Sequence, residues 1–152
     1  PACKTFKSRK IKLIISTRQL DYMLFDGQGE VYSSNILKYP KLTLDPKSGV
    51  MDVNIKVEMS YLGIETGGIS SFKLSGKSND LWIGNYGGDG LVDARGLVVN
   101  NAVILHKGTN VLKLNVVNSI DAKLQSTGDV LLFQTPTTVK EEFTNTGRIL
   151  YN

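Results

Sequence analysis

The 152-residue chain has the length and composition of a globular domain rather than of a disordered protein. Hydrophobic residues make up 41% of it and charged residues 21%, and this balance supports a buried core. Its apolar runs are far shorter than the roughly 18 residues of a membrane-spanning helix. The net charge is +4, and Lys4 to Lys12 alone holds five basic residues. We interpret this segment as a solvated terminus, and we expect neither a nucleic-acid partner nor a membrane span.

The chain contains one cysteine, Cys3, and one histidine, His106. An internal disulfide is therefore excluded, and no zinc site is predicted. Because no glycine-rich phosphate motif precedes a helix, we expect no metal, nucleotide or covalent cofactor. No apolar signal segment precedes Cys3, so the chain is either cytoplasmic or begins after a removed leader. Ala2 followed by Cys3 resembles a lipoprotein cleavage site, which leaves lipid anchoring at Cys3 as an alternative.

Short β-strands are predicted throughout the first third of the chain. Ile11 to Ile15 is a compact apolar run, and Tyr22 to Phe25 is another that ends at a glycine turn. Glu30 to Ile36 is predicted to return as a third strand, and Lys41 to Asp45 to form a half-buried strand near a sheet edge. No stretch has a sustained helical period. Residues 1–48 are therefore predicted to form N-terminal strands and a tail, packed at the side or end of the remaining chain.

From residue 49 to residue 152, one pattern of about 20 residues is repeated about five times. Each unit holds an extended run, a glycine turn and a second apolar run. The fixed period predicts a β-solenoid, because only a stacked neighbour can cover the apolar face of each unit. The first runs begin at Leu62, Leu81, Ala102, Ile120 and Val139. The glycine turns are predicted at Gly67, Gly88, Gly108, Gly128 and Gly147. The second runs begin at Ile69, Leu91, Val111, Val130 and Ile149.

The alternation within the runs predicts which side chains point inward. One interior position is predicted to hold Phe72, Ala94, Leu114 and Phe133, and the position two residues earlier Val92, Leu112 and Leu131. An outward ladder is predicted for Lys73, Arg95, Asn115 and Gln134. Before the first runs stand polar pairs whose side chains can stack along the solenoid, at Asn79-Asp80, Asn100-Asn101, Asn118-Ser119 and Thr137-Thr138.

The order of these pieces resembles a bacterial family, the putative auto-transporter adhesin, head GIN domain. The residues that carry the resemblance are Leu62 to Ile69, Phe72 to Gly76, Leu81 to Ile83, Gly88 to Ala94 and Ser126 to Val130. The resemblance implies a right-handed, single-stranded parallel β-helix, the hand that parallel crossovers prefer. The glycine turns differ from the Gly-Ser-Gly type of the family. The resemblance also implies a non-catalytic adhesion-type module of the cell envelope, periplasmic or extracellular, although a fold does not fix a function.

A polysaccharide-active lyase or hydrolase is an alternative that a β-helix suggests. Its chemistry would need carboxylates gathered on one face beside a basic residue. The available groups are scattered over different runs: Asp89, Asp93, Arg95, Asp121, Lys123, Glu141 and Glu142. We therefore predict no catalytic residue. Gly87 to Leu91 resembles a calcium-binding nonapeptide, but its aspartate is misplaced and it occurs once, so a plain turn is predicted there.

The residues on either side of Trp82, Val103 and Leu105 are expected to point inward. These three side chains are therefore predicted to point outward and to form an apolar strip. Such a strip would mark an interface or pack beneath the N-terminal strands. Tyr86 adds a second aromatic ring near Trp82 that could stack on a sugar. The predicted interaction surface is Trp82, Tyr86, Val103, Leu105, Lys73 and Arg95. Its expected partners are a glycan or protein at the cell surface, or a second copy of the chain. A structural spacer in a larger envelope assembly is the remaining alternative.

Overall fold

The computed structural model describes residues 11–47 and 49–152, which contain β-strands and no helix. The first three strands are β1 (Tyr22–Leu24), β2 (Gln28–Tyr32) and β3 (Lys41–Asp45). Four long strands come next, β4 (Val50–Thr66), β5 (Ser71–Asn85), β6 (Leu91–His106) and β7 (Leu112–Leu124). The last three are β8 (Val130–Leu132), β9 (Thr138–Phe143) and β10 (Ile149–Tyr151).

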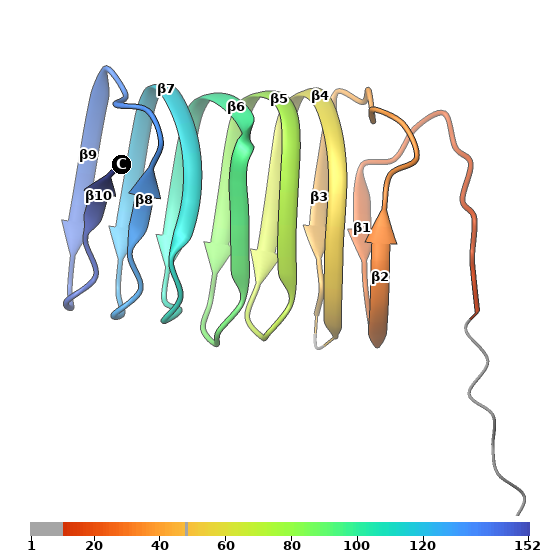
Figure 1. The fold of residues 1–152 in the computed structure, drawn as a ribbon, viewed down its shortest axis with the longest axis horizontal. Helices are drawn as coiled ribbons and strands as arrows, with labels where there is room; N and C mark the ends of the chain where they lie inside the picture. The colour runs from red at the N-terminus through yellow and green to blue at the C-terminus, as the bar shows by residue number, and fades with distance from the viewer. Residues whose placement is uncertain (1–10, 48) are drawn as a thin grey trace, which may run out of the picture.

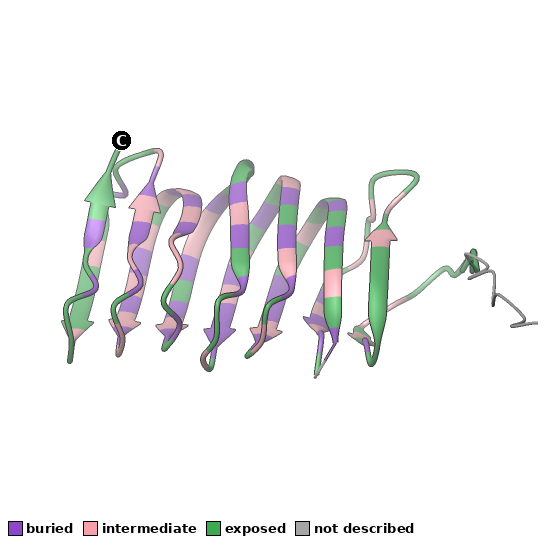
Figure 2. Cartoon of the chain, turned by 60° about the horizontal axis from the view of Figure 1, so that its bottom comes forward, coloured by how far each residue is buried: buried purple, intermediate pink, exposed green. Residues whose placement is uncertain are grey.

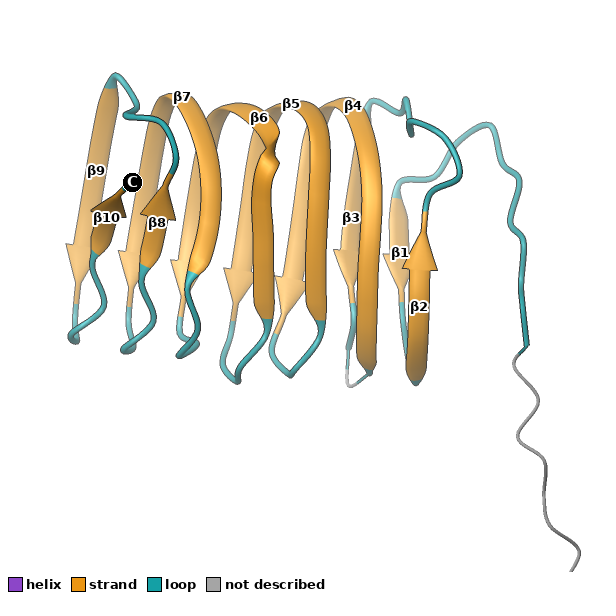
Figure 3. Ribbon diagram, in the orientation of Figure 1, coloured by secondary structure: helices purple, strands orange, loops and turns teal. Residues whose placement is uncertain are grey.

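These strands wind into a right-handed parallel β-solenoid of about seven turns (Figure 1). Every strand pair is parallel. The chain rises along a front layer, crosses the top and descends along a rear layer while it advances from right to left, which is a right-handed winding (Figure 1). The front layer holds β2, the first parts of β4 to β7, β8 and β10. The rear layer holds β1, β3, the second parts of β4 to β7, and β9. Turns join the layers at the bottom of each coil (Figure 3).

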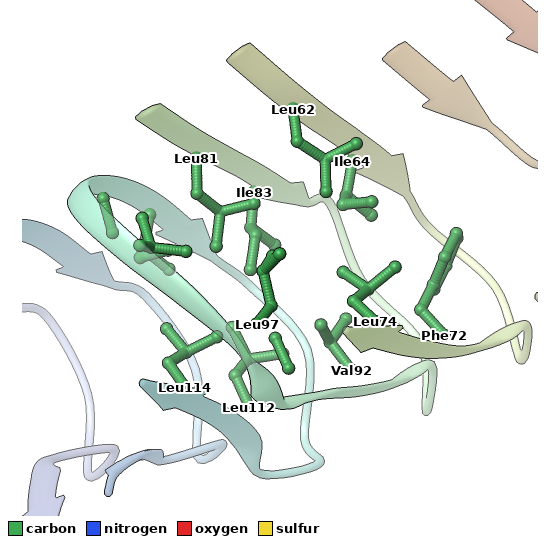
Figure 4. Packing of buried hydrophobic residues seen from close by; sticks show 14 of the residues in the cluster. Leu62, Ile64, Phe72, Leu74, Leu81, Ile83, Val92, Leu97, Leu112 and Leu114 are labelled. Carbon is green, nitrogen blue, oxygen red and sulfur yellow. The ribbon is translucent and has the colours of Figure 1, made fainter. Parts of the chain in front are cut away.

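The register confirms the repeat that the sequence predicted. The residues that open the first runs are direct partners from coil to coil, in the order Leu62, Leu81, Ala102, Ile120 and Val139. Side chains alternate between buried and exposed along β4, β5 and β6 (Figure 2). Leu62 and Ile64 of the rear layer face Phe72 of the front layer across a dry interior (Figure 4). Burial of this shared apolar column drives stacking of the coils.

The predicted register of the interior positions was wrong by two residues at Phe72 and by one residue at Leu131 and Phe133. Phe72 pairs with Val92, and the column continues through Leu112, Val130 and Ile149. The partner of Leu114 is Leu132 rather than Phe133. The physical reason is that the coils differ in length: Phe72 and its partner Val92 are 20 residues apart, whereas Leu112 and its partner Val130 are 18 residues apart. Leu91, predicted to open a buried run, is 51% exposed.

The turns at the bottom of the coils contain a column of glycines in close backbone contact. Its members are Gly27, Gly49, Gly68, Gly88, Gly108, Gly128 and Gly147. A Cβ on Gly88 would lie 2.6 Å from the carbonyl oxygen of Gly68, and one on Gly108 would lie 2.9 Å from that of Gly88. Gly68 therefore occupies the place predicted for Gly67. The column needs glycine at Gly49, Gly88, Gly108, Gly128 and Gly147, because a Cβ at each would lie within 3 Å of a neighbouring backbone oxygen.

The solenoid begins earlier than predicted, within the first third of the chain. Residues Gln28–Tyr32 pair with Val50–Asn54, and Lys41–Leu44 pair with Tyr61–Ile64. These strands are therefore the first coils of the same solenoid, rather than a unit packed against it. The predicted strand at Ile11 to Ile15 is wrong, because these residues form no strand and stay exposed.

The predicted polar ladder is present at the top of the coils. Asn100 Nδ2 donates to Asn79 Oδ1 at 2.8 Å, and Asn101 Nδ2 donates to Asp80 Oδ1 at 3.0 Å. Ser119 Oγ extends the second chain by donating to Asn101 Oδ1 at 2.9 Å. Asn101 thus joins three successive coils through one side chain.

We expect Asn101→Ala to lower the free energy of unfolding by about 1 kcal/mol, because it removes two side-chain hydrogen bonds at a half-buried position. Asn118→Ala is the matched control, since Asn118 is exposed beside the same ladder. Urea unfolding of both variants measures the difference. Equal midpoints for the two variants would show that the ladder adds no stability.

Candidate functional site

The rear layer presents an outward column that holds two aromatic residues separated by two smaller ones. Tyr22, Thr43, Gly63, Trp82 and Val103 are successive partners in the parallel ladder. They point outward because the residues before and after them, such as Leu62 and Ile64, fill the interior. The column therefore projects two large rings from one side of the solenoid.

Glu65 is the polar centre of this surface. Trp82 Nε1 donates a 2.7 Å hydrogen bond to Glu65 Oε1. Hydrogen bonding to Glu65, together with burial, raises the pKa of the Tyr86 hydroxyl to about 12. Burial, with the charge of Glu65, also raises the pKa of Tyr61. One carboxylate thus holds two aromatic side chains, Trp82 from β5 and Tyr86 from the turn after β5, and its charge acts on Tyr61 of β4.

Two glycines let these rings lie against the backbone. A Cβ on Gly84 would come within 2.7 Å of Glu65 Oε2 and 2.8 Å of the Tyr86 hydroxyl oxygen. A Cβ on Gly63 would come within 3.2 Å of Tyr61 Cε1. Gly63 and Gly84 therefore form a floor on which the Tyr61, Glu65 and Tyr86 side chains lie, and an added Cβ would push these side chains away.

A second phenol–carboxylate pair lies one coil toward the N-terminus. The Tyr22 hydroxyl donates a short hydrogen bond to Asp45 Oδ2. This bond is the main reason that the pKa of Tyr22 is raised. Among the described residues, neither Asp45 nor Glu65 forms an ion pair with a lysine or arginine. Both carboxylates are thus bound to aromatic partners rather than to basic side chains.

We call the group of Tyr22, Asp45, Tyr61, Glu65, Trp82 and Tyr86 the aromatic face. Its rings supply flat apolar surfaces, with Tyr22 51% and Tyr86 52% exposed. Each carboxylate has lone pairs beyond those used by its tyrosine or tryptophan partner. A hydroxyl-rich ligand could therefore stack on the rings and donate hydrogen bonds to the carboxylates.

Val103 and Leu105 extend the aromatic face by one coil. Val103 is 46% exposed and Leu105 is half-buried, and both point outward as predicted. Beyond them the rear layer is covered by ion pairs. Lys140 Nζ lies 2.6 Å from Asp121 Oδ2, and Lys123 Nζ lies 2.7 Å from Glu142 Oε1. The apolar strip thus ends at β6 and a charged surface begins at β7.

Lys73 and Arg95 lie on the front layer, away from the aromatic face. Lys73 pairs with Asp93 in the ladder, so the predicted shared position of Lys73 and Arg95 is wrong. Arg95 instead forms a two-pronged contact with Asp93, in which Nε donates to Oδ1 at 2.9 Å and NH2 lies 2.6 Å from Oδ2. The contact lowers the pKa of Asp93. The guanidinium also lies 5.5 Å from the ring centre of Phe133. The six predicted residues therefore do not form one surface.

Four of the five carboxylates considered for catalysis are engaged in separate surface contacts. Asp93, Asp121 and Glu142 pair with basic residues, and Asp89 accepts a hydrogen bond from the Thr109 hydroxyl. Gly87 and Gly88 have positive φ angles of 148° and 77°, so the segment before Asp89 is a tight turn. Within the described residues, no group of three histidine, cysteine or acidic side chains could hold a metal ion.

Four members of the aromatic face were not predicted: Tyr22, Asp45, Tyr61 and Glu65. The alternation in β4 contained a signal for two of them, because Tyr61 and Glu65 flank the interior residues Leu62 and Ile64. Tyr22 and Asp45 could not be placed without knowing that the first coils belong to the solenoid. Cys3 and most of the basic segment from Lys4 to Lys12 lie outside the described residues.

No helix that could cross a bilayer occurs in the described part of the chain. Comparisons with curated proteins and with solved structures found no match. The model of one protein family does match, over residues 2–136. That range takes in the first coils, which the resemblance from residue 49 onward did not include. This match agrees with the right-handed solenoid and its glycine turns. The chain belongs to the family described as putative auto-transporter adhesin, head GIN domain.

Proposed function

We propose that the chain is a non-catalytic, adhesion-type module of the cell envelope that binds a neutral glycan on the aromatic face. The observation that supports this most strongly is the arrangement around Glu65, where Trp82 and Tyr86 are held by one carboxylate over a glycine floor. The family description supports an adhesion role at the cell surface and names no enzyme. Placement in the periplasm or outside the cell belongs to the same proposal.

Neutral sugars suit this surface better than acidic ones. A sugar ring carries an apolar C–H face that can pack on an aromatic side chain, and hydroxyls that can donate to a carboxylate. The charges of Asp45 and Glu65 would repel an acidic sugar, since neither is paired with a basic residue among the described residues. A polysaccharide-active enzyme would need a convergent acid–base pair, whereas both carboxylates here are bound to phenol or indole groups.

The chain offers a direct signal for binding, because Trp82 is its only tryptophan. We expect a neutral oligosaccharide chosen from a glycan array to shift the emission of Trp82. Trp82→Ala should weaken binding about tenfold, as measured by calorimetry, because it removes the stacking surface and one hydrogen bond to Glu65.

Tyr151→Ala is the matched control, since Tyr151 is 53% exposed but lies in the last strand of the front layer. It should bind as the unmodified chain does. Thermal unfolding of each variant shows whether weaker binding comes from the loss of a contact or from unfolding of the protein. Turnover of the bound glycan would contradict the proposal, and equal affinity of Trp82→Ala and Tyr151→Ala would exclude the aromatic face as the binding surface.

A further inference from the structure

A second, chemically different hollow lies on the front layer, where the chain leaves β2. It has a volume of about 530 Å³ and is lined by Tyr32, Ser33, Ser34, Asn35, Ile36, Asn54, Lys56 and Ser75. Three elements supply its walls: the segment after β2, the first part of β4 and the neighbouring coil of β5. In Figure 1 the segment after β2 loops outward before it joins β3 at the rear. The volume falls within the range of small-molecule sites.

The wall of this hollow is anchored at both of its ends. Ser33 N donates to Asn54 O at 3.2 Å, and Lys56 N donates to Ser33 Oγ at 2.9 Å. On the other side, Leu37 N donates to Lys56 O at 2.8 Å, and Leu37 packs against the core. Ser34, Asn35 and Ile36 are therefore held outward between two fixed points, so the hollow is formed before any ligand arrives.

The lining residues suit a ligand that carries both a negative charge and several hydroxyl groups. It contains hydroxyl and amide groups, one cation and no acidic side chain. Among the described residues, Lys56 forms no ion pair. Glu58, the next outward residue on β4, is paired with Lys38 at 2.8 Å, and this contact lowers the pKa of Glu58. Asp52 lies on the opposite side and accepts a hydrogen bond from Ser71. Of the residues that line the hollow, the lysine is thus the charged one.

We infer that this hollow binds the carboxylate of an acidic sugar unit, such as a uronate. Lys56 would neutralise the carboxylate, while Asn54, Asn35 and Ser75 would bond to ring hydroxyls. A smaller hollow shares Asn54 with it and reaches across the next coils, and its charged lining residues are Asp52, Lys73 and Asp93. The acidic unit could therefore belong to a longer chain that runs across the coils. This site is independent of the aromatic face, which lies on the other layer and carries the opposite charge.

The test uses tetragalacturonate and its methyl ester, which differ in charge and share the same sugar. We expect calorimetry to detect binding of the acid and not of the ester. Lys56→Met should weaken binding of the acid about tenfold, because it removes a charge-assisted contact. Asn54→Asp should weaken it at least as much, because it places a negative charge beside the ligand.

Lys107→Met is the matched control, since Lys107 is also exposed but lies in a turn far along the chain. It should bind the acid as the unmodified chain does, and so should Trp82→Ala. Titration with sodium sulfate tests whether the hollow selects a sugar carboxylate or binds any small anion. If sulfate competes with the acid at equal concentration, the hollow would be reassigned to simple inorganic anions. Equal binding of acid and ester, equal binding by Lys56→Met and Lys107→Met, or no binding of the acid would each overturn the inference.

Discussion

Gly128→Ala should lower the free energy of unfolding by about 3 kcal/mol, because the added methyl group has no room. Its Cβ would lie 2.6 Å from the carbonyl oxygens of both Asn110 and Gly108, and closer still to His106 Nε2. Two of these three contacts are to backbone atoms that the stacking of coils holds in place, and the third is to the buried ring of His106. Relief would require two neighbouring turns to separate.

Gly67→Ala is the matched control for this variant. Gly67 lies in the same kind of turn, but a Cβ there would meet nothing nearer than Tyr86 Cβ at 3.8 Å. Thermal unfolding should show the Gly128 variant melting roughly 10 °C lower than the Gly67 variant. If the two variants melt together, close glycine contacts do not hold the coils in place.

Stability should fall as the pH drops below 6.5, because His106 is buried in the corner of the solenoid. Its side chain is 0% exposed, and it stacks between Asn85 and Leu124 in the ladder. Nε2 lies 2.9 Å from Asn110 O and donates to it, which leaves Nδ1 without a partner among the described residues. Burial lowers the pKa of His106, and the Asn110 bond and Asp129 oppose this only in part.

The lowered pKa of His106 determines in which direction stability changes with pH. A histidine that is harder to protonate when folded stabilises the protein fully above its unfolded pKa of 6.5. That contribution is lost as the pH falls from 6.5 toward the folded pKa, by up to about 1.4 kcal/mol per pH unit. Asp93 and Glu58 also have lowered pKa values, but their contributions are lost only below their ordinary values of 3.8 and 4.5. The range from pH 6.5 to 5 therefore isolates His106.

His106→Asn is the variant that checks this assignment. It copies Asn85, which occupies the same position in the preceding coil. Asparagine does not titrate, so urea unfolding of the variant should be insensitive to pH between 6.5 and 5, whereas the unmodified chain loses stability. Parallel pH curves for the two proteins would place the acid sensitivity elsewhere.

The sequence predicts the solenoid well because its period and its alternation have direct physical causes. Leu62, Leu81 and Ala102 fall into register because each must bury an apolar side chain on the one before it. The glycine turns follow from close backbone approach, as at Gly128. Where coils differ in length, as between the pairs Phe72–Val92 and Leu112–Val130, counting residues places side chains one or two positions off.

Only Trp82 and Tyr86 of the aromatic face were predicted, because its centre is a contact between side chains and not a sequence pattern. Alternation places Trp82 on the outside, but it does not show that Glu65 from the previous coil accepts its indole hydrogen bond. The same alternation cannot separate two layers that share a period. Lys73 and Arg95 of the front layer were therefore grouped with Trp82 of the rear layer, whereas Arg95 contacts Asp93 on its own strand.

The most direct test of the account is to map a bound neutral oligosaccharide by backbone amide chemical shifts. The probe is the neutral glycan that the array selects, titrated into the labelled full chain. We expect the shifts to cluster at Tyr61–Glu65 and Trp82–Tyr86, where the aromatic rings surround Glu65. Shifts confined to the front layer, or the absence of any saturable shift with neutral glycans, would contradict the account.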